Sequence, residues 1–513
     1  MADDRVEGTE RATTVPRFVV VAAFLGCLGI SSVWALITPL MAAPDEATHM
    51  IRAVGLWHGD LIGRPFDFTE PGPPLVQATM FEVTVPGGYR EISNQTACFD
   101  AGQGPAGCAP GLQEEPGERL MATIAGAYPP LWYGLYGAPS RLMSPTEAVY
   151  AARLASALVA SSLVAAGLAA TWAFGGQRAT ALALLGLTPV AAWLFGAINP
   201  NGLEIAGSFT LWSSVLALIR HPESRWLAGT VIVAAIAVAW SRPLSAAMVV
   251  GIIGTAMFVT ADGTSLRALV RSRAARLAGG GVGVAVVSAG LWVGASGALD
   301  TFIAKPDASL TPGVAAAGSW DVADLRLQQM VAVFGSLDTY APDPVFWVWG
   351  GAVAALALGG LWCGTGRQRV GILGLVVATV ALPVVAEALT AAELGYTWQG
   401  RYTLPVAIGI VACSTEAITR GPRRLPPRVP GVLVAVIGVA VVVGHVMGHL
   451  TSMARYSTGP GTSLLGYLTQ PGWSPPGPDV ALLLGAAVGV GALVVAPWLP
   501  RFSTESGAST RRR

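Results

Sequence analysis

Charge is scarce in this chain. Only 12% of its 513 residues are Asp, Glu, Lys or Arg, whereas soluble domains carry about a quarter. Lys305 is the only lysine, and a net charge of +1 gives no basic surface for nucleic acid, which excludes that class of partner. Hydrophobic residues make up 53% of the chain, and its mean hydropathy is +0.57. These values exclude an ordinary soluble domain and indicate an integral membrane protein.

The alternating polar and apolar pattern of a membrane β-barrel is also lacking, because the apolar runs are continuous. A spanning helix needs about 20 apolar residues. Run length and the Gly, Pro and charge punctuation predict an all-α protein with about twelve transmembrane helices. We place them at residues 18–40, 147–174, 179–197, 203–219, 226–240, 243–261, 277–297, 344–363, 370–390, 404–419, 430–450 and 480–498.

The first apolar run, residues 18–40, follows Arg5, Arg11 and Arg17 and superficially resembles a secretory signal. The apolar region of such a signal is only about 7–15 residues long. We therefore expect an uncleaved first transmembrane helix.

The positions of arginine predict the orientation, because cytoplasmic loops collect Lys and Arg. Residues 128–143, YPPLWYGLYGAPSRLM, are apolar and aromatic but short, and counting them as a span would invert every later helix. With this segment as a helix on the outer surface, both termini are cytoplasmic. Twenty of the 31 basic residues then lie on the cytoplasmic side: Arg5, Arg11, Arg17, Arg178, Arg220, Arg225, Arg267, Arg271, Arg273, Arg276, Arg367, Arg369, Arg420, Arg423, Arg424, Arg428, Arg501, Arg511, Arg512 and Arg513.

This topology divides the chain into a core, a hairpin and two tails. We expect a cytoplasmic tail 1–17, a transmembrane core 18–420, a C-terminal hairpin 421–498 and a cytoplasmic tail 499–513. The long hydrophilic segments all fall on the outer side, and loops of such length usually carry function. These external loops are 42–146, which carries the surface helices, 299–343 and 451–479.

Cysteine is rare, with five residues in the chain. Cys98 and Cys108 lie in the first external loop, where they form either a disulfide or a pair of free thiols, and the sequence favours neither. The other three are in apolar runs. His and Cys are not spaced as zinc ligands.

The stretch APDEATHMIR, residues 43–52, places four ionisable groups directly after the first span. Pro44 fits the first turn of a helix, and Asp45, His49 and Arg52 then share one face, with Glu46 beside them. A solvated helix start with a ladder of ion pairs would explain this pattern structurally. An acid pair beside a membrane span shifts our interpretation towards a functional site at the outer boundary.

Other polar residues are expected at the same level of the membrane. Taken singly, Asn199 could cap a helix, and Arg242 or Arg401 could reach the interface. Their common side favours one shared cavity over separate accidents. The motifs are YPPLWYGLYG with Tyr128, Trp132, Tyr133 and Tyr136; INPNGLE with Asn199, Asn201 and Glu204; WSRPL with Arg242; GSLDTYAPDP with Asp338 and Tyr340; and YTWQGRYTLP with Tyr396, Gln399, Arg401 and Tyr402.

This combination of side chains suits glycosyl transfer from a lipid phosphate. A carboxylate can take the proton of an acceptor hydroxyl as that hydroxyl attacks the anomeric carbon. Arginine binds two phosphate oxygens with its planar fork, and aromatic rings stack on sugars. Because the outer face has no nucleotide sugars, a lipid carrier reached from the bilayer is the expected donor.

The motifs PDEATH (the P-D-E-x-x-H pattern), YPPLWYGLYG, INPNGLE, FGSLDTYAP and WQGRYTLP (with Q-G-R-Y) together resemble a large bacterial family of polytopic membrane proteins of unknown function. That family is similar to the GT-C class of membrane glycosyltransferases, and the resemblance covers residues 18–420. It implies a GT-C-like helical bundle, a polyprenyl-phosphate sugar donor that enters from the membrane lipids, and a cell-envelope glycan, lipid or protein as acceptor. Inversion at the anomeric carbon is expected by analogy.

The resemblance also implies roles for single residues. An acid in the first external loop is the usual base, which maps onto Asp45, with Glu46 assisting or organising the site. For the donor phosphate we expect Arg401 first, then Arg52 and Arg242. The substrate-binding residues are expected to be His49, Tyr128, Trp132, Tyr133, Asn199, Glu204, Asp338, Tyr340, Gln399 and Tyr402.

Two points stay open. Asn201 stands where many relatives are expected to have an acid, so a metal or acid role at that turn is doubtful. Asp45, Glu46 and Asp338 offer oxygen ligands for Mg²⁺ or Mn²⁺, but a lipid monophosphate donor does not require a metal.

Two other functions are compatible with about twelve spans. A transporter or lipid-linked-glycan flippase usually carries its polar groups near the middle of the bilayer, and an internal repeat is not evident here. A non-catalytic assembly protein of the envelope is the third possibility. The Ala-, Gly- and Arg-rich composition is typical of a high-GC bacterium such as an actinobacterium, and cell wall biosynthesis in the plasma membrane is the expected setting.

Overall fold

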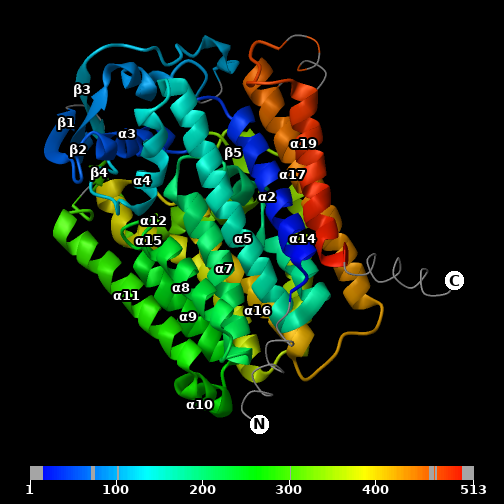
Figure 1. The fold of residues 1–513 in the computed structure, drawn as a ribbon. Helices are drawn as coiled ribbons and strands as arrows, with labels where there is room; N and C mark the ends of the chain where they lie inside the picture. Colours follow the sequence, from blue (N-terminus) through cyan, green and yellow to red (C-terminus); the bar gives the residue numbers. More distant parts are fainter. Residues whose placement is uncertain are drawn as a thin grey trace.

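The computed structural model describes residues 15–70, 76–100, 103–300, 302–461, 467, 469 and 471–499. Most of the two expected tails, with their arginines at 5, 11, 501 and 511–513, lies outside these residues. Helices dominate the described part, and Figure 1 shows them as a bundle. They are α2 (Arg17–Ile37), α3 (Glu46–Trp57), α4 (Leu131–Gly137), α5 (Pro145–Ala183), α6 (Pro189–Phe195), α7 (Pro200–Arg220), α8 (Arg225–Ala239), α9 (Ser245–Thr260), α10 (Gly263–Arg271), α11 (Arg273–Ser296), α12 (Pro312–Asp321), α13 (Ala323–Val331), α14 (Asp343–Cys363), α15 (Gly366–Leu394), α16 (Gly400–Arg420), α17 (Val429–Thr458) and α19 (Asp479–Val495).

The expected all-α integral membrane protein is confirmed. Within the described residues, nine helices are long and apolar enough to cross a bilayer: α2, α5, α7, α11, α14, α15, α16, α17 and α19. The apolar helices α8 and α9 are shorter, with 15 and 16 residues. The described residues thus hold nine long and two shorter apolar helices, close to the expected number of about twelve.

One expected span, 179–197, is not a continuous helix. Gly176 interrupts α5 with φ 65° and ψ −157°, a conformation that favours glycine. The chain then ends α5, passes through the short 3-10 turn η6 (Leu184–Gly186) and restarts as α6 behind Thr188, whose side chain caps the new helix. The η6 turn and the Thr188–Pro189 helix start break the expected span 179–197, whereas Gly176 falls between that span and the preceding one at 147–174.

The first long loop contains a β-sheet, which the sequence analysis did not predict. Strands β1 (Arg64–Glu70), β2 (Val76–Pro86) and β3 (Glu118–Thr123) are antiparallel in this order, and β4 (Phe302–Ala304) from the second long loop also pairs with β2. Along β2, Phe81, Val83 and Val85 are buried in alternation, as expected for a strand with one face against the protein. The sheet thereby joins the two loops.

The segment 128–143 does not cross the bundle. Its helical part is α4, only seven residues long, followed by the 3-10 turn η5 (Ala138–Arg141). A helix of that length spans about 10 Å, far less than a bilayer. A short helix that does not span the membrane is therefore present in this segment, as expected. The loops hold further 3-10 turns η1 (Gly87–Tyr89), η2 (Ile92–Asn94) and η4 (Ala106–Cys108), and η7 (Ala496–Trp498) follows α19.

The sheet and the short amphipathic helix α10 lie at opposite ends of the bundle, which we call the sheet end and the α10 end (Figure 1). The central helix is α7, because every residue of its apolar stretch is buried. In α11 and α15, by contrast, most residues of the apolar stretch are not buried. A helix buried all round is expected in the middle of a bundle. The start of α7 points to the sheet end, where the polar motifs gather. The two-stranded pair β5 (Val333–Phe334) and β6 (Thr339–Tyr340) also precedes α14 in this region.

Candidate functional site

Asp45 has an unusual backbone. With φ 57° and ψ 12° it adopts the left-handed conformation, which is costly for residues other than glycine, although Asp tolerates it better than most. It precedes the first residue of α3, Glu46, but its side chain does not cap the helix. Strained residues persist where the surrounding structure holds them, and they are common at functional sites.

The Asp45 carboxylate instead binds Arg401, which lies in the first turn of α16. Arg401 Nη2 donates to Asp45 Oδ2 at 2.6 Å, and 356 residues separate the partners in sequence. The Asp45 side chain is 42% exposed, whereas that of Arg401 is 5% exposed. The pair thus combines an accessible carboxylate with an almost buried cation.

A second arginine joins this centre through Tyr402. The guanidinium carbon of Arg242 lies 4.4 Å from the centre of the Tyr402 ring, and that of Arg401 lies 4.9 Å from it. Arg401 Nη2 also donates to the Tyr402 hydroxyl at 3.1 Å, and Nη1 donates to the side chain of Gln399. Two cations therefore share one aromatic ring close to the Asp45 carboxylate.

Glu204, in the first turns of α7, supplies the counter-charge of Arg242. The Arg242 guanidinium lies 3.8 Å from Glu204 Oε2, and the Ser245 hydroxyl donates to Glu204 Oε1 at 2.5 Å. Asn201 donates its side-chain amide to Glu204 Oε2 at 3.1 Å. Burial alone would lower the pKa of Arg242, but Glu204, Tyr128, Tyr402 and Asp45 together raise it above its usual value. Arg242 is therefore a permanent cation.

His49 and Tyr133 form a polar pair beside the acid. His49 Nδ1 and the Tyr133 hydroxyl are 2.9 Å apart, and the Tyr128 ring lies 6.2 Å from the His49 ring. Burial lowers the pKa of His49 to about 4, against the raising effect of Asp45 and with a further lowering by Arg242 and Arg401. Burial also raises the pKa of Tyr128, while Arg242 lowers it. His49 is therefore neutral at neutral pH.

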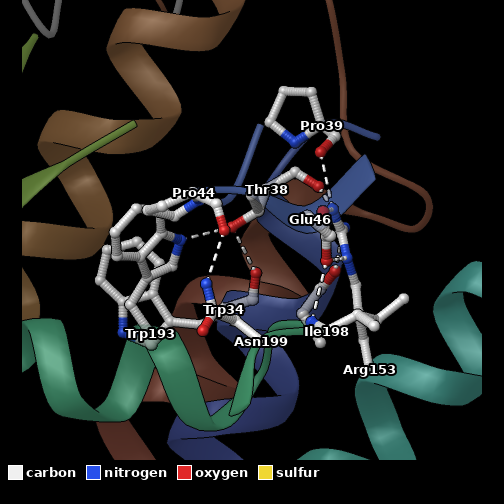
Figure 2. A network of polar contacts seen from close by, with 10 residues as sticks. Trp34, Thr38, Pro39, Pro44, Glu46, Arg153, Trp193, Ile198 and Asn199 are labelled. Carbon is white, nitrogen blue, oxygen red and sulfur yellow. Dashed lines mark hydrogen bonds and ion pairs between the residues drawn. The ribbon is translucent and has the colours of Figure 1, made fainter. Parts of the chain in front are cut away.

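Glu46 has an environment opposite to that of its neighbour. Its two carboxylate oxygens accept from Arg153 Nε at 2.8 Å and Arg153 Nη2 at 2.5 Å, and both side chains are 0% exposed. The backbone N–H of Ile198 donates to Glu46 Oε1 at 3.1 Å. Arg153 also donates to the carbonyls of Ala35, Thr38 and Pro39 (Figure 2). Glu46 is thus enclosed, and its ion pair with Arg153 joins the start of α3 to α5.

The turn before α7 fixes the residue that precedes Asp45. Asn199 Nδ2 donates to the Pro44 carbonyl at 2.6 Å, while Asn199 Oδ1 accepts from the Asn201 N–H and caps α7. On the other side, Trp193 Nε1 donates to the Thr38 hydroxyl at 3.1 Å (Figure 2). The expected capping role of Asn199 and a positioning role for Asp45 are therefore combined in one side chain.

Arg52 lies away from the Asp45–Arg401 pair. It is fully buried, and its guanidinium donates to the carbonyls of Asp60, Leu61 and Tyr128. Burial lowers its pKa to about 10, so it still carries its charge at neutral pH. With Nη1 and Nη2 bound to backbone carbonyls, Arg52 holds the loop after α3 in place, while its buried Nε–H has no hydrogen-bond partner among the described residues. Phosphate binding by Arg52 stays a prediction.

Asp338 and Tyr340 are not brought to the Asp45 centre. Asp338 Oδ2 accepts from Arg455 Nη2 at 2.8 Å, and Arg455 also donates to the carbonyls of Phe99 and Gly104. Tyr340 is 41% exposed on β6. Asp338 therefore pairs with α17, and Arg455 links this pair to the first loop.

Arg455 contacts the loop that contains the two loop cysteines. Cys98 and Cys108 form a disulfide in the structure, with 6.1 Å between their Cα atoms.

Trp132, another expected site residue, uses Nε1 to donate to the Ala237 carbonyl at the end of α8. This hydrogen bond joins the Trp132 side chain to α8.

The oxygen ligands expected for Mg²⁺ or Mn²⁺ do not gather. Glu46 is committed to Arg153 and Asp338 to Arg455, which leaves Asp45 without the two other carboxylates. In the described part of the chain, no three His, Cys, Asp or Glu residues form a group that could hold a metal. These residues therefore do not form a site for either metal ion.

Arg153 was not among the expected site residues, although it lies inside an expected apolar span. An ionisable residue in a span is rare and marks a functional or structural centre, so this signal was available. The expected site residues also omit Arg326, which pairs with Glu387; Glu387 Oε1 accepts from the Trp398 N–H, and Gln329 Oε1 accepts from the Gly400 N–H. These contacts hold the start of α16, where Arg401 lies.

Fold and site together define a class: a multi-pass α-helical membrane protein with a cluster of acids, arginines and aromatic residues at helix ends on one side of the bundle. A family model described as "Predicted membrane protein (DUF2142)" matches residues 28–410. The chain belongs to this family, whose matched region contains the whole Asp45–Arg401 centre. No curated protein and no solved structure matches the chain.

Proposed function

We propose that this protein is a GT-C-type glycosyltransferase that transfers a sugar from a polyprenyl-phosphate donor to a cell-envelope glycan, lipid or protein. The observation that carries the proposal is the 2.6 Å contact between the accessible carboxylate of Asp45 and the nearly buried guanidinium of Arg401. The guanidinium of Arg242 lies beside the same centre, because it contacts the Tyr402 ring that Arg401 also contacts. The resemblance of the PDEATH and QGRY motifs to that class of enzymes supports the same reaction.

In the proposed reaction Asp45 is the general base. The acceptor hydroxyl gives its proton to Asp45, its oxygen forms a bond to the anomeric carbon, and the bond from that carbon to the phosphate oxygen breaks. The electron pair leaves with polyprenyl phosphate, whose added negative charge is stabilised by Arg401 and Arg242. Displacement in one step inverts the anomeric carbon.

Arg401 retains capacity for an anion. Its Nε–H is buried and has no hydrogen-bond partner among the described residues, and an unsatisfied buried donor is costly. A phosphate oxygen can accept from this N–H, and a donor phosphate would also compete with Asp45 for Nη2. Donor binding would then release the Asp45 carboxylate for proton transfer. The donor would therefore bind before the acceptor can react.

The position of the centre favours transfer over transport. Asp45 lies before α3, Arg242 between α8 and α9, and Arg401 in the first turn of α16, so the polar groups are at helix ends. Transporters more often place their binding site at the middle of the membrane, on broken helices.

Asp45→Asn tests the role of the base. We expect sugar transfer from a polyprenyl-phosphate donor to fall by about 10²–10⁴-fold, because the amide cannot accept the proton, while donor binding is largely retained. Transfer is measured with purified protein and a radiolabelled lipid-linked sugar. Asp67→Asn, an exposed acid on β1, is the matched control and should keep full activity.

A second variant separates the two roles at the centre. Arg401→Gln should weaken donor binding, in contrast to Asp45→Asn. Full transfer by the Asp45→Asn protein would remove Asp45 from the mechanism, and movement of an unmodified solute into vesicles by the purified protein would support a transporter instead.

A further inference from the structure

A cavity lies at the α10 end, remote from Asp45. It has a volume of about 510 Å³ and is bordered by the bend of α5, the end of α16 and the start of α17. Ligand pockets in proteins measure roughly 300–1,000 Å³. The bend exists because Gly176 is left-handed, which turns the chain and places Gln177 and Arg178 on the cavity wall.

The polar part of this wall offers donors and positive charge. Gln177 Nε2 is buried and lacks a hydrogen-bond partner among the described residues. Arg424 uses Nη1 for the Thr419 carbonyl at 3.0 Å, which leaves other guanidinium N–H groups for a ligand. Within the described ranges, neither Arg178 nor Arg424 has an acidic partner, and no carboxylate lines the cavity. An anion is the ligand that such a wall favours.

The rest of the wall is apolar and continues onto an exposed surface of α17. Leu182, Ile418, Leu425 and Val434 line the cavity together with two prolines. Val434 is half-buried, and Gly431, three residues earlier on the same side of α17, is exposed, so the wall reaches a surface of α17 that can face the acyl chains of the bilayer. A ligand with an anionic head and an apolar tail satisfies both parts of the wall, whereas a soluble anion satisfies only one.

We propose that this cavity binds the phosphate headgroup of an anionic phospholipid. The guanidinium groups of Arg178 and Arg424 and the amide of Gln177 contact the phosphate oxygens, and an acyl chain lies along α17 beside Val434. Basic pockets between membrane helices bind such headgroups by charge-assisted hydrogen bonds. This inference does not depend on the proposed sugar transfer.

The test measures lipid binding to the full chain. Native mass spectrometry of the purified protein is carried out with phosphatidylglycerol and with phosphatidylcholine of the same acyl chains, and we expect the anionic lipid to bind more tightly. Arg178→Gln combined with Arg424→Gln should weaken phosphatidylglycerol binding by roughly fivefold per arginine. Arg267→Gln combined with Arg271→Gln removes the same charge from α10, outside the cavity, and should leave binding unchanged.

Two uncharged changes guard against a double variant that fails to fold. Val434→Trp fills the cavity and Gln177→Leu removes the unpaired amide, and both should weaken phosphatidylglycerol binding. Equal losses in the cavity and α10 double variants would overturn the proposal, since they would show diffuse charge attraction. Competition by inorganic phosphate or glycerol phosphate at the same concentrations as the lipid would also overturn it, because the ligand would then be a soluble anion.

Discussion

At the scale of single residues, Asp45 and Glu46 show how the surroundings separate two adjacent acids. Both carry a carboxylate at the start of α3, but Asp45 is 42% exposed and pairs with Arg401, whereas Glu46 is enclosed with Arg153. A buried ion pair is strongly coupled to the fold, because removing one partner leaves an uncompensated charge. A partly exposed pair contributes little to stability.

Glu46→Gln should therefore destabilise the protein by about 3–5 kcal/mol, since Arg153 would lose its counter-charge in a dry interior. The thermal unfolding midpoint in one detergent is the measurement. Asp45→Asn is the matched control and should cost about 1 kcal/mol or less. A Glu46→Gln protein as stable as the Asp45→Asn protein would show that the buried pair between α3 and α5 does not stabilise the fold.

These assignments were only partly accessible from the sequence. Asp45, Arg401 and Tyr402 were identified by type and position, because ionisable and aromatic residues beside a span are rare. The division of work between Asp45 and Glu46 was not, since both follow Pro44 and only the partner brought by α5 distinguishes them.

At the scale of elements, the C-terminal hairpin is attached to the core by close helix contact. The hairpin, α17 and α19, lies beyond the region matched by the family, yet α19 packs along α2. Gly26 of α2 and Gly489 of α19 face each other: a Cβ at Gly26 would lie 2.8 Å from the Gly489 carbonyl oxygen. Small residues allow membrane helices to approach in this way.

Gly26→Ala should separate α2 from α19 and destabilise the protein by about 1–3 kcal/mol, because the added methyl meets backbone atoms that cannot rotate away. Thermal unfolding in detergent measures the change. Gly491→Ala on the same α19 is the control, since a Cβ there meets nothing within 4 Å. Equal midpoints for the two variants would mean that the α2–α19 contact adapts without cost.

The sheet is the element that the sequence analysis did not find. Its strands are short, and β2 pairs with β4 from a loop more than 200 residues later in the chain, so pairing across that distance is not visible in local pattern. The alternation of Phe81, Val83 and Val85 was the available signal.

At the scale of the whole molecule, arginine marks one end of the bundle. The described arginines of the α10 end lie at helix ends and in short connections: Arg178, Arg220, Arg225, Arg267, Arg271, Arg273, Arg276, Arg367, Arg369, Arg420, Arg423, Arg424 and Arg428. By the tendency of basic residues to stay in the cytoplasm, we infer that this end is cytoplasmic and that the Asp45 centre faces the outer side.

Cysteine labelling tests this orientation. A cysteine introduced as Arg428→Cys should be protected from a membrane-impermeant thiol reagent in intact cells and should react after lysis. Glu118→Cys on β3 is the opposite control and should react in intact cells. The background is low because Cys27, Cys363 and Cys413 are buried and the other two cysteines are paired. If Arg428→Cys reacted in intact cells and Glu118→Cys did not, the orientation would be the opposite of the one inferred here.

The sequence by itself determined that this is a multi-pass helical membrane protein, because hydropathy and run length are local properties that the bilayer reads directly. It also supplied the types of residue at the sheet end. Only the tertiary structure decided which of them meet: Arg401 reaches Asp45 across 356 residues, and Arg52 turns to backbone carbonyls. The physical reason is that a buried charge takes whichever partner the packing of distant helices provides, and local sequence does not contain that choice.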